Sequence, residues 1–264
     1  MLVFDHVSVF YGGTQVLRGL SFSIRDGEQV GLLGANGAGK STLMKAALGL
    51  VPYTGSITVD GLPVTRENLP AVRRKLGYVL QDADNQMFMP TVLDDMLFGP
   101  MNYGLSRAEA ERQADETLAS LHMEHLKLRH NHKMSGGEKR MAAIAAILAM
   151  KPDMLFMDEP FSALDAVLRE HLQHFLKQLR ERHPCTMVFV THDIGEAVYL
   201  GQHIMLLGAR QSRVAAFGAN PSFTDNANVD VRGTDAFYAV QRRLHNAVAA
   251  VRAGQELHLT DGTW

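Results

Sequence analysis

The sequence predicts a mixed α/β fold, and three observations carry this prediction. A glycine-rich loop at residues 34–42 lies between an apolar run and a helical pattern, the strand, loop and helix order of a phosphate-binding loop (P-loop). Two later apolar runs, residues 154–157 and 187–190, have the length and composition of buried parallel strands. Residues from about 82 to 150 show helical patterns instead, so we expect a helical segment inserted into an α/β core.

The chain begins with a pattern typical of antiparallel strands. Residues 2–10 and 20–24 alternate between apolar and polar side chains, and residues 11–13 between them have the composition of a turn. Residues 28–33 predict the strand before the P-loop, and residues 41–48 predict the helix after it. We therefore expect an N-terminal antiparallel β subdomain next to a P-loop core.

The middle of the chain is expected to be mainly helical. Residues 74–80 predict a strand that ends at Gln81, where the helical segment begins. Within that segment, residues 108–122 carry apolar side chains at helical spacing, and Ser106 can cap the helix with Glu109 three residues later.

The last part of the chain returns to alternating strands and helices. Residues 165–182 predict a helix between the two buried strands, and residues 203–208 and 213–217 predict the final strands of the sheet. Beyond residue 220 the composition turns to Asn, Asp and Gly, and we expect one more helix at residues 235–252.

Length and composition limit the possible functions. The 264 residues suit one domain at 1–220, with the helical segment 82–150 inserted, and a small C-terminal extension at 221–264. A net charge of -2 gives no basic surface for nucleic acid. The one cysteine, Cys185, excludes a disulfide within the chain and favours a reducing compartment. The longest purely apolar run, residues 141–150, is about half as long as a membrane span requires, so any work at a membrane needs a membrane partner.

The P-loop residues have chemical roles that fit a nucleoside triphosphate. The glycines let backbone N–H groups approach phosphate oxygens, Lys40 adds positive charge at the β and γ phosphates, and the Ser41 hydroxyl can bind Mg²⁺. The alternative is a glycine-rich turn with a capping serine, which the strand and helix on either side disfavour. We expect seven consecutive residues to contact the nucleotide: Asn36, Gly37, Ala38, Gly39, Lys40, Ser41 and Thr42.

Two acidic residues follow the apolar run at 154–157. The end of this strand would direct Asp158 toward the Mg²⁺ ion and Glu159 toward an attacking water. After a P-loop, we prefer this interpretation to a solvated turn. The dipeptide Thr191-His192 follows the strand that ends at Val190, which places the imidazole at the carboxyl ends of the strands, where open α/β sheets bind ligands.

A second glycine turn precedes the helix that follows residue 135. Ser135, Gly136 and Gly137 predict another cradle of backbone N–H groups for an anion. The alternative is a helix cap with two flexible glycines, and both interpretations stay open.

The P-loop, the second glycine turn, the acidic pair and the histidine after the later strand follow one another in the order typical of the ABC ATPase family, which the chain resembles over residues 1–220. The resemblance identifies residues 34–42 as Walker A, 154–159 as Walker B, 135–138 as the signature and 162–165 as the D-loop. It also implies an ABC ATPase fold, with a RecA-like P-loop core, the antiparallel β subdomain and the helical insert. Two positions depart from the usual pattern: Met134 stands where leucine is common, and Glu138 where glutamine is common.

The resemblance further implies ATP hydrolysis with Mg²⁺. The implied catalytic residues are Glu159, the Q-loop residue Gln81 and the switch histidine His192, with Ser41, Gln81 and Asp158 as Mg²⁺ ligands. Tyr11 matches the aromatic residue that stacks on adenine. Each ATP would lie between Walker A of one subunit and Ser135, Gly136 and Gly137 of the other in a head-to-tail homodimer, with an ATPase heterodimer as the alternative.

Residues 81–88, 95–105 and 139–145 are similar to a narrower group, the ATPases of energy-coupling-factor transporters, especially the cobalt and nickel branch. Ala83 replaces the proline usual in that group. This similarity implies a transmembrane coupling protein and a substrate-binding membrane subunit as partners, no nucleic acid, and a peripheral location at the cytoplasmic face of the cell membrane. Asp94 is one candidate to meet arginines of the coupling protein.

Several alternatives stay open. Asp95 is the second candidate for contact with the coupling protein, and the alternative is that it and Asp94 cap a helix that starts near Thr91. The chain could serve another importer of vitamin, haem or amino acid, or be a soluble ABC ATPase. A nucleotide or sugar kinase would leave the second glycine turn and His192 without a role. The histidines between residues 122 and 132 do not have the spacing of a helical zinc site, so we expect them to be solvated.

Overall fold

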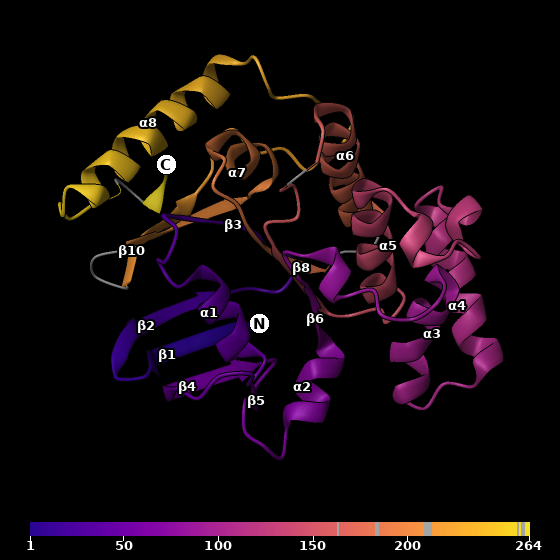
Figure 1. Ribbon diagram of the computed structural model, residues 1–264. Helices are drawn as coiled ribbons and strands as arrows, with labels where there is room; N and C mark the ends of the chain where they lie inside the picture. Colours follow the sequence, from indigo (N-terminus) through magenta and orange to yellow (C-terminus); the bar gives the residue numbers. More distant parts are fainter. Residues whose placement is uncertain (163, 183–184, 209–212, 258, 260–261) are drawn as a thin grey trace. The chain divides into compact units, whose positions relative to one another are not determined.

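The computed structural model describes residues 1–162, 164–182, 185–208, 213–257, 259 and 262–264 (Figure 1). The chain forms two compact units. The first unit combines Met1–Arg73 with Leu176–Trp264, and the second unit is Arg74–Phe175. Both units contain strands and helices, so the predicted mixed α/β fold is confirmed.

The first unit begins with a four-stranded antiparallel sheet. Its strands lie in the order β2 (Thr14–Ile24), β1 (Leu2–Tyr11), β4 (Thr54–Val59) and β5 (Leu62–Pro63). The predicted hairpin is confirmed, but its second strand starts at Thr14 rather than at residue 20. The side-chain alternation breaks at Gly19, whose φ of +54° lies in the left-handed region that glycine tolerates, so the pattern alone reveals only the end of β2.

A second sheet in the first unit is built around β3 (Gln29–Gly34). This strand pairs in parallel with β8 (Thr186–Val190) and with β9 (His203–Gly208), and β10 (Arg213–Ala219) pairs antiparallel with β9. Every residue of β8 is buried, because a parallel strand covered on both faces has no solvent side. Helix α1 (Lys40–Ala47) follows β3 through the glycine-rich loop, which confirms the predicted strand, loop and helix order.

The C-terminal extension is part of the first unit and packs on its helices and strands. Helix α8 (Asp235–Arg252), predicted at these residues, lies against α7 (Ile194–Leu200) (Figure 1). Trp264 is 2% exposed, and its Nε1 donates a hydrogen bond to the carbonyl oxygen of Ile204 in β9 at 2.7 Å. Arg243 of α8 donates to the carbonyl oxygen of Trp264 at 2.9 Å, so the last residue is fixed to both the sheet and α8.

The second unit contains two parallel strands, β6 (Leu76–Val79) and β7 (Met154–Asp158). The prediction of a strand at residues 74–80 is wrong at its start, because Arg74 and Lys75 belong to α2 (Leu69–Lys75). Arginine and lysine are good helix formers, and they continue α2 up to the first buried strand residue. Helix α6 (Ala166–Arg182) carries the chain from the second unit into the first.

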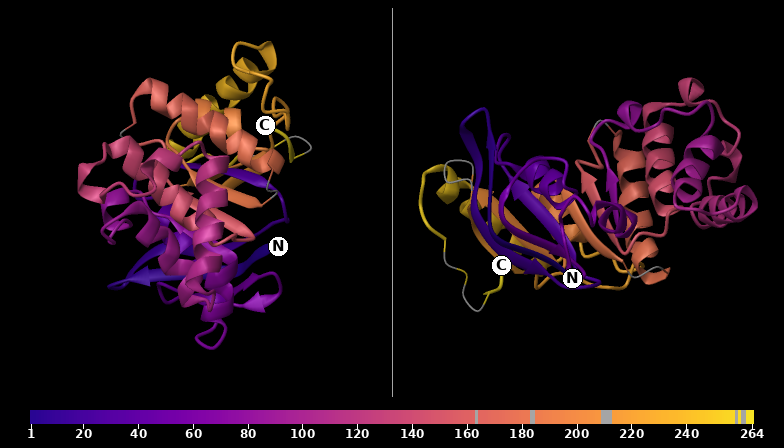
Figure 2. Two further views of the ribbon diagram at one scale, coloured as in Figure 1. Left: turned by 90° about the vertical axis from the view of Figure 1, so that its right-hand side faces the viewer. Right: turned by 90° about the horizontal axis from the view of Figure 1, so that it is seen from below.

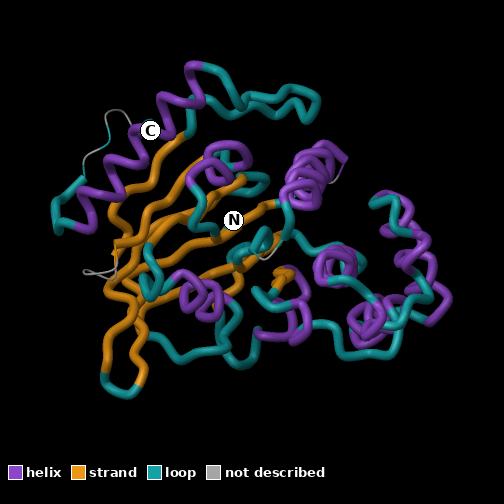
Figure 3. The backbone as a smooth tube through the Cα atoms, turned by 45° about the horizontal axis from the view of Figure 1, so that its top comes forward, coloured by secondary structure: helices purple, strands orange, loops and turns teal. Residues whose placement is uncertain are grey.

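Helices make up most of the second unit, as predicted for residues 82–150. They are α3 (Val92–Asn102), α4 (Arg107–Ser120) and α5 (Gly136–Leu148), with short 3₁₀ turns η1 (Ala83–Asn85), η2 (Glu124–Leu126) and η3 (Asn131–Lys133). The loops that join them are teal in Figure 3. Ser106 and Glu109 form the predicted capping box at the start of α4.

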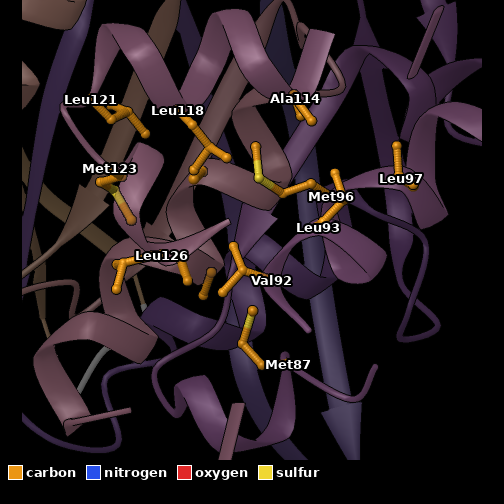
Figure 4. Close-up of a cluster of buried hydrophobic side chains, with 14 of the residues drawn as sticks. Met87, Val92, Leu93, Met96, Leu97, Ala114, Leu118, Leu121, Met123 and Leu126 are labelled. Carbon is orange, nitrogen blue, oxygen red and sulfur yellow. The ribbon is translucent and has the colours of Figure 1, made fainter. Parts of the chain in front are cut away.

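The segments that precede α3 and α5 share one hydrophobic core (Figure 4). Met87 contributes from the first segment, Val92 from the start of α3, and Leu126 and Met134 from the second segment. Each of these four side chains is 8% exposed or less. The common core holds the two segments together as one packed body within the second unit.

Candidate functional site

The P-loop of the first unit is built on two glycines with positive φ. Gly37 has a φ of +79° and Gly39 a φ of +94°. A Cβ added at Gly39 would lie 2.6 Å from Cδ2 of Leu17 in β2, so no larger residue fits there. A Cβ at Gly37 would meet no described atom within 4 Å. The loop is therefore tight on the side of β2 and open at Gly37, where a phosphate can approach.

Lys40 is held against the loop by backbone carbonyl groups. Its Nζ donates to the carbonyl oxygens of Gly34 at 2.8 Å and Ala35 at 3.1 Å, and the residue is 6% exposed. Burying an ammonium group costs free energy unless partners surround it, and these carbonyls supply them. A phosphate oxygen is a stronger, charge-assisted acceptor for the same group.

Helix α1 starts without a side-chain cap. Its N-cap is Gly39, and no side chain accepts from the first backbone N–H groups, whereas Thr91, Ser106 and Ser135 cap α3, α4 and α5. Uncapped N–H groups at a helix N-terminus favour an anion. Ser41 lies in this first turn, so its hydroxyl is close to the same N–H groups. The first unit therefore has the local geometry that a bound phosphate requires.

Parallel strand pairing brings His192 to the same edge of the sheet as the P-loop. Val190 at the end of β8 lies opposite Leu32, two residues before the end of β3, and His192 is the second residue after Val190. Asp193 accepts hydrogen bonds from the backbone N–H groups at the start of α7, which fixes the chain after His192. His192 is therefore at the carboxyl ends of the strands, as expected. Tyr11 ends β1 in the same unit and is 43% exposed.

In the second unit, parallel pairing brings Gln81 next to the acidic pair. Val79 of β6 lies opposite Met157 of β7, and Gln81 and Glu159 follow these strand ends. The Gln81 Nε2 donates to the Glu159 Oε2 at 3.2 Å. Two residues that are 78 positions apart in the sequence are thus in contact, and both are predicted catalytic residues.

Asp158 is a buried carboxylate at the end of β7. It is 5% exposed, and its Oδ2 accepts a hydrogen bond from the Tyr78 hydroxyl at 3.1 Å. Burial, together with this neighbouring carboxylate, raises the pKa of Tyr78, so Tyr78 keeps its proton and remains the donor. The Tyr78 contact orients the Asp158 carboxylate, and no local sequence pattern predicts it.

One buried arginine ties the two strand ends together. Arg140 of α5 is 4% exposed; its Nη1 donates to the carbonyl oxygen of Leu80 at 2.6 Å and its Nη2 to that of Glu159 at 2.9 Å. The same Nη2 donates to the Ser162 hydroxyl at 3.1 Å, and burial lowers the pKa of the guanidinium. Glu159 has a φ of +47°, a region that costs a non-glycine residue free energy unless its surroundings hold it there. Arg140 supplies such a restraint.

Ser135 is the N-cap of α5. Its hydroxyl accepts from the Glu138 backbone N–H at 3.3 Å, and the Glu138 carboxylate accepts from the Ser135 backbone N–H at 2.7 Å. Hydrogen bonds from the Ser135 backbone and side chain lower the pKa of Glu138. The helix-cap interpretation is therefore confirmed. It does not exclude anion binding, because the Ser135 hydroxyl can rotate and donate its proton to another acceptor.

The two glycines after Ser135 have different surroundings. A Cβ at Gly136 would meet no described atom within 4 Å. A Cβ at Gly137 would lie 1.7 Å from Cδ2 of Leu168 in α6. Gly137 is therefore required for packing inside the second unit, whereas Gly136 borders open space that a ligand or another chain can enter.

The expectation that Asp94 and Asp95 both contact a partner is wrong for Asp95. Asp95 is 7% exposed and accepts from the backbone N–H groups of Phe88 and Met89, both at 3.2 Å. Asp94 accepts from the hydroxyl of Thr91, the N-cap of α3, at 2.6 Å. The alternative, that these acids serve the start of the helix and its surroundings, describes the structure better.

Three further predictions from the sequence concern the D-loop, the histidines between residues 122 and 132, and a membrane span. In the predicted D-loop, Ala163 lies outside the described residues. The rings of His130 and His132 are 5.5 Å apart, but within the described ranges no group of three or more His, Cys, Asp or Glu side chains could hold a metal ion. Across the same described residues, no helix has the length and apolar character needed to cross a bilayer.

Comparison with known proteins identifies the family to which the chain belongs. The model of the ABC transporter family matches residues 17–162, which include the P-loop, the signature and the acidic pair. The chain belongs to the ABC transporter ATPase family. It is 44% identical over 213 residues to the cobalt import ATP-binding protein CbiO of Rhodobacter capsulatus, covering 80% of this chain and 75% of that protein. It is 39% identical to the energy-coupling factor transporter ATP-binding protein EcfA of Methanoculleus marisnigri, covering 77% and 74% of the two chains.

Solved structures of ABC ATPases share the fold. CbiO1 from Clostridium perfringens, part of the ABC transporter complex CbiONQ, has a TM-score of 0.76 and 29% identity, covering 95% of this chain and 98% of that one. The dimeric ATP-binding cassette MJ0796 bound to ADP and Pi has a TM-score of 0.73 and 28% identity, covering 83% and 98%. These similarities confirm the predicted ABC ATPase fold.

The contacts of Arg140 predict a role in ATP hydrolysis by this ABC ATPase. In Arg140→Gln, two partly buried carbonyl groups lose charged donors, which destabilises the backbone around Glu159 by about 1–3 kcal/mol. We expect kcat to fall about 10- to 100-fold with the KM for ATP nearly unchanged, since the P-loop is in the other unit. Steady-state ATPase measurements check this, with Lys139→Gln, which loses an ion pair to Asp84, as the control. Equal kcat for both variants would contradict the role.

Proposed function

We propose that this ABC ATPase is the motor subunit of an energy-coupling-factor importer for cobalt or nickel. The observation that carries the proposal is the 44% identity to a cobalt import ATPase over 80% of the chain, which comes with the complete order of ABC motifs. The similarity to EcfA and to CbiO1 supports the same class of transporter. An ATPase subunit of another importer, for vitamin, haem or amino acid, is the alternative, and a soluble ABC ATPase is the second.

The proposed hydrolytic residues are those that the motifs of the sequence predict. Ser41, Gln81 and Asp158 carry the hydroxyl, amide and carboxylate oxygens that Mg²⁺ prefers, which supports their assignment as its ligands. Bound Mg²⁺ would neutralise charge on the phosphates. Glu159 accepts the proton of the attacking water, and Gln81, which donates to that carboxylate, orients it. His192 would contact the γ phosphate, and Tyr11 would stack on the adenine.

We further propose that two copies bind ATP head to tail, with Ser135, Gly136 and Gly137 of one copy on the γ phosphate bound by Walker A of the other. The open space at Gly136 supports this arrangement, and so does the dimeric form of the related cassette MJ0796. The partner copy is a second molecule of this chain or a related ATPase subunit.

Glu159→Gln is expected to bind ATP but to lose most hydrolysis. The amide keeps the shape of the side chain and its contact with Gln81, but it cannot accept a proton at neutral pH. We expect turnover to fall at least about 100-fold, since general-base catalysis contributes about 10²–10⁴-fold. ATPase assays and equilibrium ATP binding measure the two effects. Near wild-type turnover would remove Glu159 from the catalytic role.

Gly136→Asp is the variant that tests the dimer. A side chain at Gly136 meets no described atom within 4 Å, so the chain should fold normally, while its carboxylate repels the γ phosphate of the other copy. We expect ATP affinity to change less than about twofold and ATP-dependent dimerisation to be lost in sedimentation. Gly136→Ala is the matched control. A Gly136→Asp chain that dimerises normally with ATP would exclude the head-to-tail arrangement. Gly137 is unsuitable, because any side chain there collides with Leu168.

Docking on a transmembrane coupling protein is proposed for the second unit. Phe88 is 64% exposed and Phe98 43% exposed, and their rings contact edge to face with centroids 4.9 Å apart. Exposed aromatic pairs are typical of protein interfaces. The same unit contains a pocket of about 360 Å³ whose lining includes Arg74, Tyr103 and Gln113. Docking of the second unit on the coupling protein would place the chain at the cytoplasmic face of the membrane as a peripheral subunit.

Phe88→Asp is expected to weaken docking, because it places a charge where an apolar contact forms. Loss of an aromatic anchor costs about 2 kcal/mol or more, so co-purification with the membrane partner should fall at least about tenfold. Leu50→Asp, 54% exposed in the first unit, is the control. ATPase activity of the isolated chain should be unchanged in both variants. Undiminished co-purification of Phe88→Asp would discard this docking surface.

Uptake of labelled Co²⁺ and Ni²⁺ in cells, with Glu159→Gln as the inactive control, tests the substrate. Uptake of neither metal by the wild-type system would reject the cobalt and nickel assignment and favour the alternative importers.

A further inference from the structure

The buried carboxylate of Asp95 joins the segment after the Q-loop to the segment before the signature. Its Oδ1 accepts from the backbone N–H groups of Phe88 and Met89, both at 3.2 Å. Its Oδ2 accepts from the side-chain amide of Asn131 at 2.5 Å. Burial raises the pKa of Asp95 and these donors lower it, so the three hydrogen bonds offset part of the cost of burying the carboxylate.

Asn131 extends this connection to the signature. Its Nδ2 also donates to the carbonyl oxygen of Met89 at 2.6 Å, and its backbone N–H donates to that of Pro90 at 3.2 Å. Its own carbonyl oxygen accepts from the backbone N–H of Met134 at 3.4 Å. The next residue is Ser135, the N-cap of α5. A continuous series of contacts therefore runs from Phe88 to the first residue of the signature.

The rest of the two segments supports the same connection. The backbone N–H of Val92 donates to the carbonyl oxygen of Arg129 at 3.2 Å, and that of Leu93 to Lys127 at 2.9 Å. A single antiparallel bridge pairs Thr91 with His130. The shared core of Figure 4 lies under these contacts. The two segments are thus hydrogen-bonded along their length, and displacement of one displaces the other.

The orientation of the Asn131 amide costs folding free energy. Its Oδ1 is buried without a hydrogen-bond partner among the described residues. Turning the amide over would place Oδ1 against two acceptors, the Met89 carbonyl oxygen and the Asp95 carboxylate, and both would lose their donor. An unpaired buried oxygen destabilises a fold, so native proteins retain one where another requirement outweighs it. Here the two donor contacts to the segment at Met89 and Asp95 are that requirement.

We propose that Asp95 and Asn131 form a strut that transmits the docking of the coupling protein at Phe88 to the signature at Ser135. This inference rests on the proposed function, since it assumes a partner that contacts Phe88. A partner that displaces the backbone at residues 88–89 displaces the Asp95 carboxylate with it, and Asn131 passes the displacement to the cap of α5. Asp95 is in this sense a positioning residue for the stimulation of ATP turnover by the partner, not for turnover of the isolated chain.

Asp95→Asn tests the strut with little change in volume. The carboxylate accepts from donors on both of its oxygens, whereas the amide has one oxygen and one NH₂ group. On the side where the NH₂ group lies, it faces another donor, so the strut loses its hydrogen bonds at that end. In the complex purified with the membrane partner, we expect stimulation of ATP turnover by the partner to fall at least about fivefold. Turnover of the isolated chain should change less than about twofold, and the amount of partner recovered should stay the same.

The neighbouring residue supplies the control. Asp94→Asn removes a charge one position away, where the side chain contacts Thr91 at the start of α3, and it should leave stimulation at the wild-type value. Asn131→Ser breaks the other end of the strut and should reproduce the Asp95→Asn result. If both strut variants are stimulated like the wild type, the strut is rejected. A merely structural role would instead lower the melting temperature and the isolated turnover together, without changing the stimulation ratio.

Hydrogen exchange on the isolated chain tests the strut without the membrane partner. The backbone N–H groups of Glu138 and Lys139 bond to Ser135 and report on the signature turn. In Asp95→Asn, we expect their exchange to become at least about fivefold faster, along with that of residues 88–89. Ala110 at the start of α4 is the internal control. Faster exchange confined to residues 88–89 would overturn the proposal. Failure of the wild-type chain to co-purify with a membrane partner would instead overturn the proposed docking, which keeps the two hypotheses distinguishable.

Discussion

The constraint on which the rest of this structure depends is the parallel pairing of strands that end together. In the first unit, β3 and β8 end at the same edge, so the P-loop and His192 emerge side by side although more than 150 residues separate them in the chain. In the second unit, β6 and β7 do the same for Gln81 and Glu159. Parallel strands require long connections, and those connections are the places where this family can carry a helical insert without disturbing the site.

The sequence predicted the parts of the site that depend on local structure. The P-loop, the acidic pair and the cap at Ser135 each need only a few consecutive residues in a strand, turn or helix, and each lies where it was expected. Helix boundaries were predictable where a capping pair such as Ser106 and Glu109 marks them. The start of β2 was not, because Gly19 interrupts its alternation, and neither was the end of α2, because β6 follows its last residue without a turn between them.

Contacts between distant segments could not be predicted, since nothing local distinguishes the residues that make them. Arg140 looks like an exposed cation at the start of an apolar helix, yet it is buried and bonds to carbonyl groups at two strand ends. Its value to the fold depends on the φ of +47° at Glu159, which is also a property of the folded chain. The strained residue and its restraint belong together: Glu159, the carboxylate that we propose for hydrolysis, lies where the backbone is held against its local preference.

Asp94 and Asp95 show how far apart the roles of two neighbouring, chemically identical residues can be. On a helix, consecutive side chains point about 100° apart, so one of the pair reaches the cap of α3 while the other turns inward to Phe88 and Asn131. A carboxylate can accept from several donors on different segments at once, which no apolar residue of similar size could do. A buried charge is a weak source of stability, but it restricts the donors around it to one arrangement. That property suits the role that we propose for this segment, which is to respond as a unit when a partner contacts its exposed end.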